Sequence, residues 1–146
     1  MNSYDIWNHL LVELFKDITN IEEKAVITPE FMDITNNDMH IIEAIGRTKE
    51  RNMSGIAKTL CVTVGTLTIA INNLVKKGYV HRTRSEKDRR VVLISLTEKG
   101  RKAYDHHKKF HEQMIHSMLN EFSEEEMKVL VKALKNLTDF FHGYQK

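Results

Sequence analysis

The sequence has few of the residues that cross-link, break or loosen a chain. Its 146 residues include one cysteine, one proline and six glycines. A single cysteine excludes a disulfide framework within the chain and is typical of a reducing compartment. So few prolines and glycines argue against long flexible linkers, and the chain has no repeats and no low-complexity segment. We therefore expect one compact cytoplasmic protein with a real hydrophobic core.

Long apolar runs and the common catalytic motifs are missing too. No apolar stretch approaches the length that crosses a bilayer, and the opening Met-Asn-Ser-Tyr-Asp does not resemble a secretory signal. The chain has no glycine-rich phosphate loop, no nucleophile elbow and no Cys/His pair close in sequence. These absences argue against a membrane protein and against an enzyme.

Basic residues are present but unevenly spread. Residues 76–109 carry 12 of the 22 lysines and arginines and only 4 of the 20 acidic residues. Residues 1–46 carry two basic and nine acidic side chains, so the net charge of +2 conceals a strong asymmetry. A basic window of this kind is typical of a phosphate-binding face. The alternative is a solvated surface without a partner.

Apolar spacing and capping residues predict a mainly helical chain. The expected helices cover residues 3–24, 36–45, a short segment from Asn52 or Ser54 to Leu60, 63–78, 98–120, and a last one from the capping box at Ser123–Glu126. Thr35, Thr63 and Thr97 are suited to be N-caps, and Gly46 and Gly78 to end helices. Residues 25–34 are expected to be a loop around Pro29.

A basic hairpin follows the fourth of these helices. Residues 80–84 and 91–96 have the composition of strands, and the charged segment Ser85–Arg90 joins them. A helix rich in threonine and asparagine, followed by a hairpin with a basic tip, is the arrangement of a winged helix-turn-helix. Such a hairpin reaches into a DNA groove, so the pattern indicates a DNA-binding regulator.

Residues 52–100 resemble the core of the MarR family of transcriptional regulators. The likeness rests on Ile56-Ala-x-x-Leu60, on the helix from Thr63 to Leu74, on Lys-Lys-Gly-Tyr-Val80, on Asp88-Arg-Arg90 and on Leu96-Thr-x-x-Gly100. Cys61 departs from the pattern, because glycine or asparagine better tolerates the left-handed backbone expected at the corner. A thiol sensor at Cys61 is an alternative, but we expect this thiol to be buried and inert.

This resemblance implies a fold and an assembly. We expect a mainly α fold with a small β-hairpin wing, and a single domain over residues 1–146. Residues 35–100 would form the DNA-binding core, and residues 1–34 and 101–146 would be dimerisation helices. The first and last helices are amphipathic, and a two-fold interface would bury their apolar faces. Packing within one subunit is the alternative. A dimer presents two recognition helices to a palindrome.

The predicted DNA-contacting residues lie on the recognition helix and the wing. Thr63, Thr66 and Thr68 offer hydroxyls and methyls to the major groove, and Asn72 and Asn73 lie where backbone contacts are expected. For Asn73, simple solvation is an equal alternative. No arginine or glutamine projects from the first two turns, so sequence preference would rest partly on DNA shape and on the wing.

In the wing, the resemblance suggests that Asp88 pairs with an arginine while Arg90 enters an A·T-rich minor groove. Lys87 and Arg84 are expected to contact phosphates, and Arg89 lies beside them. The alternative is an exposed Asp–Arg pair of little energetic value.

Within the family, the chain is most similar to a repressor of fatty-acid synthesis in Gram-positive bacteria. This likeness rests on residues 84–92, His107-Lys-Lys-Phe-His111 and Ser123–Glu126. It implies a corepressor, a long-chain acyl group on acyl carrier protein. The candidate residues for an apolar slot are Ile27, Phe31, Met39, Ile42, Phe110 and Met114, with ordinary core packing as the alternative for each.

A zinc-responsive regulator of metal uptake is the rival hypothesis. His107 and His111 are four residues apart on one helix, and the family fold would bring His40 near them. Imidazoles at this spacing bind Zn²⁺, and Glu22, Glu23 or Glu30 would have to complete the site. Histidine pairs on helices are more often structural or exposed.

Overall fold

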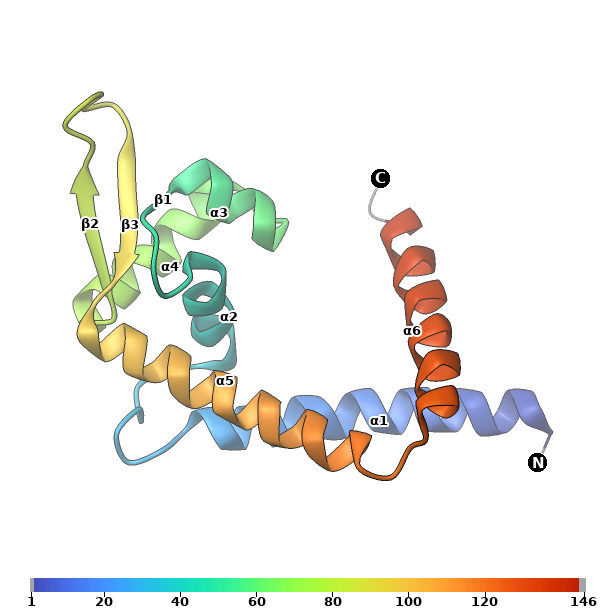
Figure 1. The fold of residues 1–146 in the computed structure, drawn as a ribbon. Coiled ribbons are helices and arrows are strands. Elements are labelled where there is room, and N and C mark those ends of the chain that lie inside the picture. Colours follow the sequence, from blue (N-terminus) through green and yellow to red (C-terminus); the bar gives the residue numbers. More distant parts are fainter. Residues whose placement is uncertain (1, 145–146) are drawn as a thin grey trace. The chain divides into compact units, whose positions relative to one another are not determined.

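The computed structural model describes residues 2–144 and divides into two compact units, one up to Lys108 and one from Lys109 onward. The first unit holds α1 (Ser3–Val26), α2 (Asn36–Ile45), β1 (Arg51–Asn52), α3 (Met53–Leu60), α4 (Val64–Lys77), β2 (Val80–Arg84), β3 (Val92–Leu96) and the start of α5 (Glu98–Leu119). The rest of α5 and α6 (Glu124–Tyr144) form the second. The predicted mainly helical fold with a hairpin wing is confirmed (Figure 1). The single-domain organisation stays a prediction.

The helices begin where the capping residues predicted. Thr35 caps α2 in a capping box with Asp38, and Thr63 caps α4 by accepting the N–H of Thr66. Asn52, and not Ser54, caps α3, and the Ser123–Glu126 box opens α6. Each such cap stabilises its helix by about 1 kcal/mol. A further box at the start of α1, between Asn2 and Asp5, was not predicted.

The sheet holds one strand more than the sequence predicted. Its order is β1-β3-β2, with both pairs antiparallel. In the hairpin, Val80 pairs with Leu96 and Arg84 with Val92, so the five residues of each strand are fully in register. On the other side of β3, Arg51 pairs with Ile94. The hairpin extends well past α3 and α4 (Figure 1), and β1 anchors its base to the start of α3.

The end of α4 is fixed by buried contacts around Tyr79. The Tyr79 ring is fully buried, and its hydroxyl donates to Asp33 Oδ1 at 2.7 Å. Burial raises the pKa of Tyr79, and the hydrogen bond from Tyr79 lowers the pKa of Asp33. Lys99 Nζ lies 4.4 Å above the ring, and Lys77 pairs with Asp38 at 2.9 Å. These contacts fasten the recognition helix to α2 and to the segment before it.

Where α4 passes into β2, the chain runs against the start of α5. Thr97 Oγ1 donates to Gly78 O and accepts the N–H of Gly100, so Thr97 is the predicted N-cap of α5. Gly78 has φ +86°, a left-handed conformation that favours glycine. At Gly100, a Cβ atom would lie 2.1 Å from the carbonyl oxygen of Tyr79. This crossing therefore requires glycine.

The long helix α1 leaves its apolar stripe uncovered. Trp7, Leu10 and Leu14 are 60%, 52% and 54% exposed, although their spacing places them on one helix face. No other described element of the first unit covers this stripe. Exposed apolar side chains gathered on one helix face are typical of a protein interface.

No single helix among residues 2–144 is long and apolar enough to cross a membrane. The pair α3 and α4 has that length and composition but bends by 106°, and its apolar residues Ile56, Leu67 and Ile71 are buried in the core.

Cys61 lies at the corner between α3 and α4 with φ +55° and ψ +42°. Its N–H bonds to the carbonyls of Ala57 and Lys58, which closes α3 in the left-handed conformation expected there. The expectation that its thiol is buried is wrong, because the side chain is exposed.

Candidate nucleic-acid interface

The side of α4 away from the core carries two rows of side chains that matter for the site. Leu67, Ile71 and Leu74 are buried and hold the helix against the core. One row lies beside the wing and consists of the exposed Val64 and the half-buried Thr68 and Asn72. A second row, Gly65, Ile69 and Asn73, is exposed. The helix therefore presents one partly covered row beside the wing and one exposed row.

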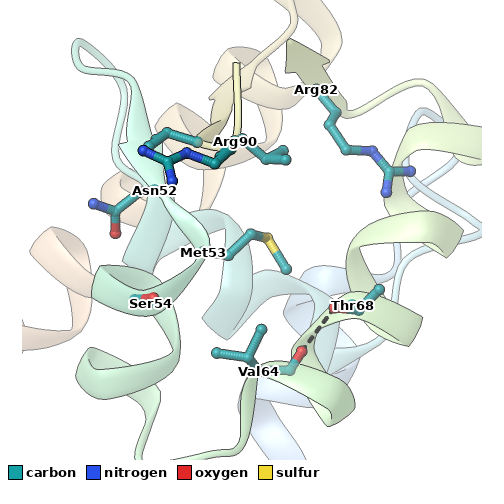
Figure 2. Close-up of a pocket in the computed structure, with 9 residues that line it drawn as sticks. Asn52, Met53, Ser54, Val64, Thr68, Arg82 and Arg90 are labelled. Carbon is teal, nitrogen blue, oxygen red and sulfur yellow. Dashed lines mark hydrogen bonds between the residues drawn. The ribbon is translucent and has the colours of Figure 1, made fainter. Parts of the chain in front are cut away.

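A cleft of about 410 Å³ separates α4 from the wing. Figure 2 shows how Thr68 and Val64 approach it from α4, Arg82 and Arg90 from the hairpin, and Met53 from the start of α3. Its remaining lining residues are Asn52, Ser54, Val91 and Val92. Two guanidinium groups and several polar side chains therefore surround one concave surface, which suits a phosphate-bearing ligand.

The threonine hydroxyls are partly engaged within the helix. Thr68 Oγ1 donates to the carbonyl of Val64 at 2.8 Å, so towards DNA it can accept a hydrogen bond and present its methyl group. Thr63 Oγ1 donates to Thr66 Oγ1 at 2.9 Å, which leaves the proton of Thr66 available for an acceptor. Thr66 lines a second, smaller cleft against α2 and not the one beside the wing. Thr66 and Thr68 therefore line different clefts on two sides of α4.

At the wing tip, the arginine that pairs with Asp88 is Arg90, the same residue that was predicted to enter the minor groove. Arg90 Nε lies 3.1 Å from Asp88 Oδ1, and the Arg90 backbone N–H donates to the same oxygen. These hydrogen bonds from Arg90 lower the pKa of Asp88. The Arg90 side chain is still 91% exposed. Asp88 thus orients the guanidinium without covering it, which fits an arginine that is presented to a groove.

The other charged residues of the wing divide into two kinds. Arg84 donates to the backbone carbonyl of Arg89 at 2.9 Å and so braces the tip from inside. Lys87 and Arg89 are exposed at the tip. The sequence placed Arg84 with the phosphate contacts, and the structure gives it this bracing contact as well.

Three residues of this surface were missed by the sequence analysis. Ile69 is 67% exposed and Val64 46%, and both are apolar residues that lie off the buried stripe of α4. That departure from the periodicity was the available signal, since exposed methyl groups beside a major groove pack against thymine methyls. Arg82 reaches the cleft from β2. Its role depends on a contact between elements, so no local pattern indicated it.

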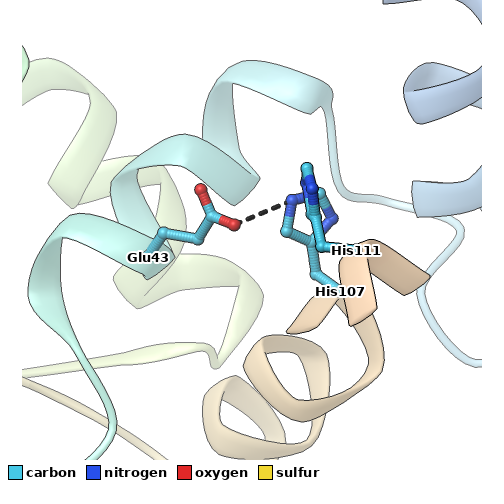
Figure 3. Close-up of side chains that lie close together, drawn as sticks. All are labelled: Glu43, His107 and His111. Atoms are coloured by element: carbon cyan, nitrogen blue, oxygen red, sulfur yellow. Dashed lines mark ion pairs between the residues drawn. The ribbon is translucent and has the colours of Figure 1, made fainter. Parts of the chain in front are cut away.

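The three histidines of the zinc hypothesis have different surroundings in the structure. His107 is 2% exposed and its Nε2 lies 2.8 Å from Glu43 Oε1. His111 lies one turn further along α5, as drawn with the other two in Figure 3. His40 instead lines the small cleft between α2, α3 and α4, because it occupies the side of α2 that faces the helix-turn-helix corner. The side chain that contacts His107 is Glu43, and a zinc site that includes His40 stays a prediction.

The residues proposed to line an apolar site for an acyl chain are mostly packed into the hydrophobic core or half-buried. Phe31, Met39 and Ile42 belong to the hydrophobic core and are at most 2% exposed. Ile27, which ends α1 in an extended conformation, is 57% exposed and so does not share their surroundings. Phe110 and Met114 are half-buried in the second unit.

Comparisons with known proteins agree with this surface. A family model described as transcriptional regulator SarA/Rot matches residues 24–107. FabT of Streptococcus pneumoniae, solved in complex with DNA, is 41% identical, with 97% of this chain and 99% of that chain covered and a TM-score of 0.90. The HTH-type regulator SarZ of Staphylococcus haemolyticus is 31% identical over 89% of this chain and 87% of its own length. PchR of Bacillus subtilis is 29% identical over 97% and 89%.

Proposed function

Since this chain belongs to the SarA/Rot family of MarR-like winged-helix transcriptional regulators, we propose that it represses fatty-acid-synthesis genes as a homodimer. Its operator would be an A·T-rich palindrome, and long-chain acyl-acyl carrier protein would be the corepressor. The chain is a DNA-binding regulator and not an enzyme, as its sequence predicted.

The observation that carries the proposal is the likeness to FabT along nearly the whole chain. The relative was solved on DNA, and 99% of its length is covered at 41% identity. The surface described above suits the same task, because α4 fits a major groove while the wing tip carries an exposed arginine for the adjacent minor groove. The uncovered apolar stripe of α1 supports a dimer, and a two-fold dimer matches a palindrome.

The wing provides a test of the proposed DNA reading. Arg90→Ala is expected to weaken operator binding by about 1–3 kcal/mol and to reduce the preference for A·T-rich sites, because a minor-groove arginine reads groove width. Asp88→Ala is expected to resemble it, since Asp88 orients the Arg90 guanidinium. The measurement is a titration of labelled operator and of random-sequence duplex at physiological salt.

Lys87→Ala is the matched control on the same tip. Loss of one phosphate contact lowers affinity for both duplexes alike and flattens the slope of log K against log salt concentration by about one. Wild-type operator affinity in Arg90→Ala would contradict the proposed role of the wing.

The corepressor requires its own experiment. Phe31, Met39 and Ile42 fill the core, so an acyl chain must displace packed side chains to enter between α1, α2 and α5. Methionine allows such repacking more readily than branched residues do. We expect acyl carrier protein that carries a C16 or C18 chain to tighten operator binding about tenfold or more, within the range of typical allosteric couplings. Gel shifts measure operator affinity in the presence of the long-chain acyl carrier protein, of the unacylated carrier and of a carrier with a C4 chain. Equal operator affinity with all three carriers would contradict this corepressor.

A zinc-responsive repressor of metal uptake genes is the second candidate. The observation that favours it is the pair formed by Glu43 and the buried His107, with His111 one turn along the same helix. One carboxylate and two imidazoles suit Zn²⁺, which would need a fourth ligand. The alternative explanation of the pair is structural, since a buried imidazole requires a hydrogen-bond partner.

Elemental analysis separates the two candidates. Under the fatty-acid proposal we expect no stoichiometric zinc in the purified protein and an acyl response that His111→Ala leaves intact. His116→Ala, an exposed histidine on the same helix, is the matched control. About one zinc per protomer in wild type, lost in His111→Ala only, would instead establish the metal site.

A further inference from the structure

A side-chain hydrogen bond joins the wing to the recognition helix. Arg82 projects from β2 and donates from Nη2 to Asn72 Oδ1 on α4 at 2.5 Å. Arg82 is exposed and lines the cleft beside Thr68. Its backbone is fixed, because Arg82 pairs with the buried Ile94 in the centre of the sheet. A long cationic side chain is thus held at both ends, by the strand and by the asparagine.

The hydrogen bond leaves most of the guanidinium available. Arginine carries five N–H donors, and Asn72 engages the group through Nη2. Fixing an arginine in advance removes part of the side-chain entropy that binding would otherwise cost. Asn72 has an amide group with no charge to neutralise the guanidinium, so Arg82 keeps its full attraction for an anion.

The position of the cleft identifies that anion. If α4 lies in a major groove and the tip at Arg90 in the adjacent minor groove, the sugar-phosphate backbone between the two grooves passes over the cleft. Arg82 lines the same cleft as Thr68 of α4 and Arg90 of the tip (Figure 2). Phosphate oxygens are the acceptors that an arginine fork engages best.

We infer that Arg82 binds the DNA phosphate between the two grooves, and that Asn72 acts on DNA through Arg82 by holding its guanidinium. This inference rests on the proposed DNA-binding function and revises the sequence prediction, in which Asn72 contacts the backbone itself. Arg82 is a binding residue, and Asn72 is a positioning residue.

A double-mutant cycle tests the inference on the full-length protein. Arg82→Ala is expected to lower affinity about tenfold for operator and random duplex alike, and to flatten the salt slope by about 0.9, the value for one phosphate. Asn72→Ala is expected to lower affinity about threefold with little change in the salt slope, because the charge of Arg82 remains. In the Arg82→Ala background, Asn72→Ala is expected to have no further effect.

Controls make each outcome decisive. Asn73→Ala changes the neighbouring asparagine on the outer row, and its effect is expected to be the same with and without Arg82. Arg82→Lys retains the charge, so the salt slope is expected to stay near that of wild type while the response to Asn72→Ala disappears. Thermal unfolding confirms that the variants fold.

Two results would overturn the inference. If the effects of Asn72→Ala and Arg82→Ala add, Asn72 contacts DNA by itself. If Arg82→Ala binds like wild type while Lys87→Ala is weakened, the protein reads DNA without Arg82. If the DNA-binding proposal itself failed, the result would differ from both of these. Wild type and Lys87→Ala would then bind operator equally poorly.

Discussion

Replacing Gly100 by alanine is expected to destabilise the first unit by about 3 kcal/mol or more, at the upper end of overpacking effects. The new Cβ would lie 2.1 Å from the carbonyl oxygen of Tyr79 and 3.2 Å from the Cβ of Leu96. Neither neighbour can move freely, because the Tyr79 carbonyl accepts the N–H of Thr97 and Leu96 is buried in the sheet. Chemical denaturation gives the free energy of unfolding.

Gly65→Ala is the matched control for this substitution. Gly65 lies in the first turn of α4, and only Thr63 Oγ1, at 4.0 Å, is near the position of an added Cβ. Alanine removes the entropy cost of a helical glycine, so we expect the free energy of unfolding to rise by about 0.5–1 kcal/mol. Equal effects of the two substitutions would show that the contact at Gly100 does not limit the fold.

A charge on the apolar stripe of α1 is expected to dissociate the dimer and abolish most operator binding. Leu14 is 54% exposed, and Leu14→Glu would place a carboxylate in an interface that buries this stripe. Separated subunits bind each half-site independently, so affinity for the palindrome falls by the avidity that linkage provides, about 10²–10⁴-fold. Sedimentation velocity measures the assembly, and gel shifts measure operator binding.

Met32→Glu controls for surface charge. Met32 is 74% exposed but lies between α1 and α2, outside the stripe. We expect it to remain dimeric and to bind operator within about threefold of wild type, since isolated surface substitutions have small effects. A dimeric Leu14→Glu protein would contradict the assignment of the stripe to the interface.

Structural features that arise from contacts between residues close in the sequence, such as helix caps, could be predicted from it. Thr35, Thr63 and Ser123 are caps because their side chains satisfy N–H groups only three residues away. The hairpin strands have the composition of strands, and a charged segment joins them. By contrast, β1 has two residues, and it is a strand only because Arg51 and Asn52 meet β3 some forty residues later. A pairing this short leaves no periodic signal.

The same distinction between local features and contacts between distant elements applies to the candidate site. The sequence identified the basic wing tip and the polar face of α4, because charge and side-chain type are visible residue by residue. It did not identify Arg82, whose partner Asn72 lies on another element. The side of α2 that His40 occupies also depends on how α3 and α4 pack, and that packing is a property of the whole core.

Trp7 gives this chain a built-in optical reporter. It is the only tryptophan, and it lies 60% exposed on the stripe of α1, far in sequence from the winged-helix core. Its emission therefore follows the polarity around α1: a red-shifted spectrum corresponds to a solvated stripe, and a blue shift on concentrating the protein corresponds to a covered one. The buried Tyr79 contributes instead to the near-ultraviolet circular dichroism of the core. Two spectra of unlabelled protein can thus follow subunit association and domain folding separately.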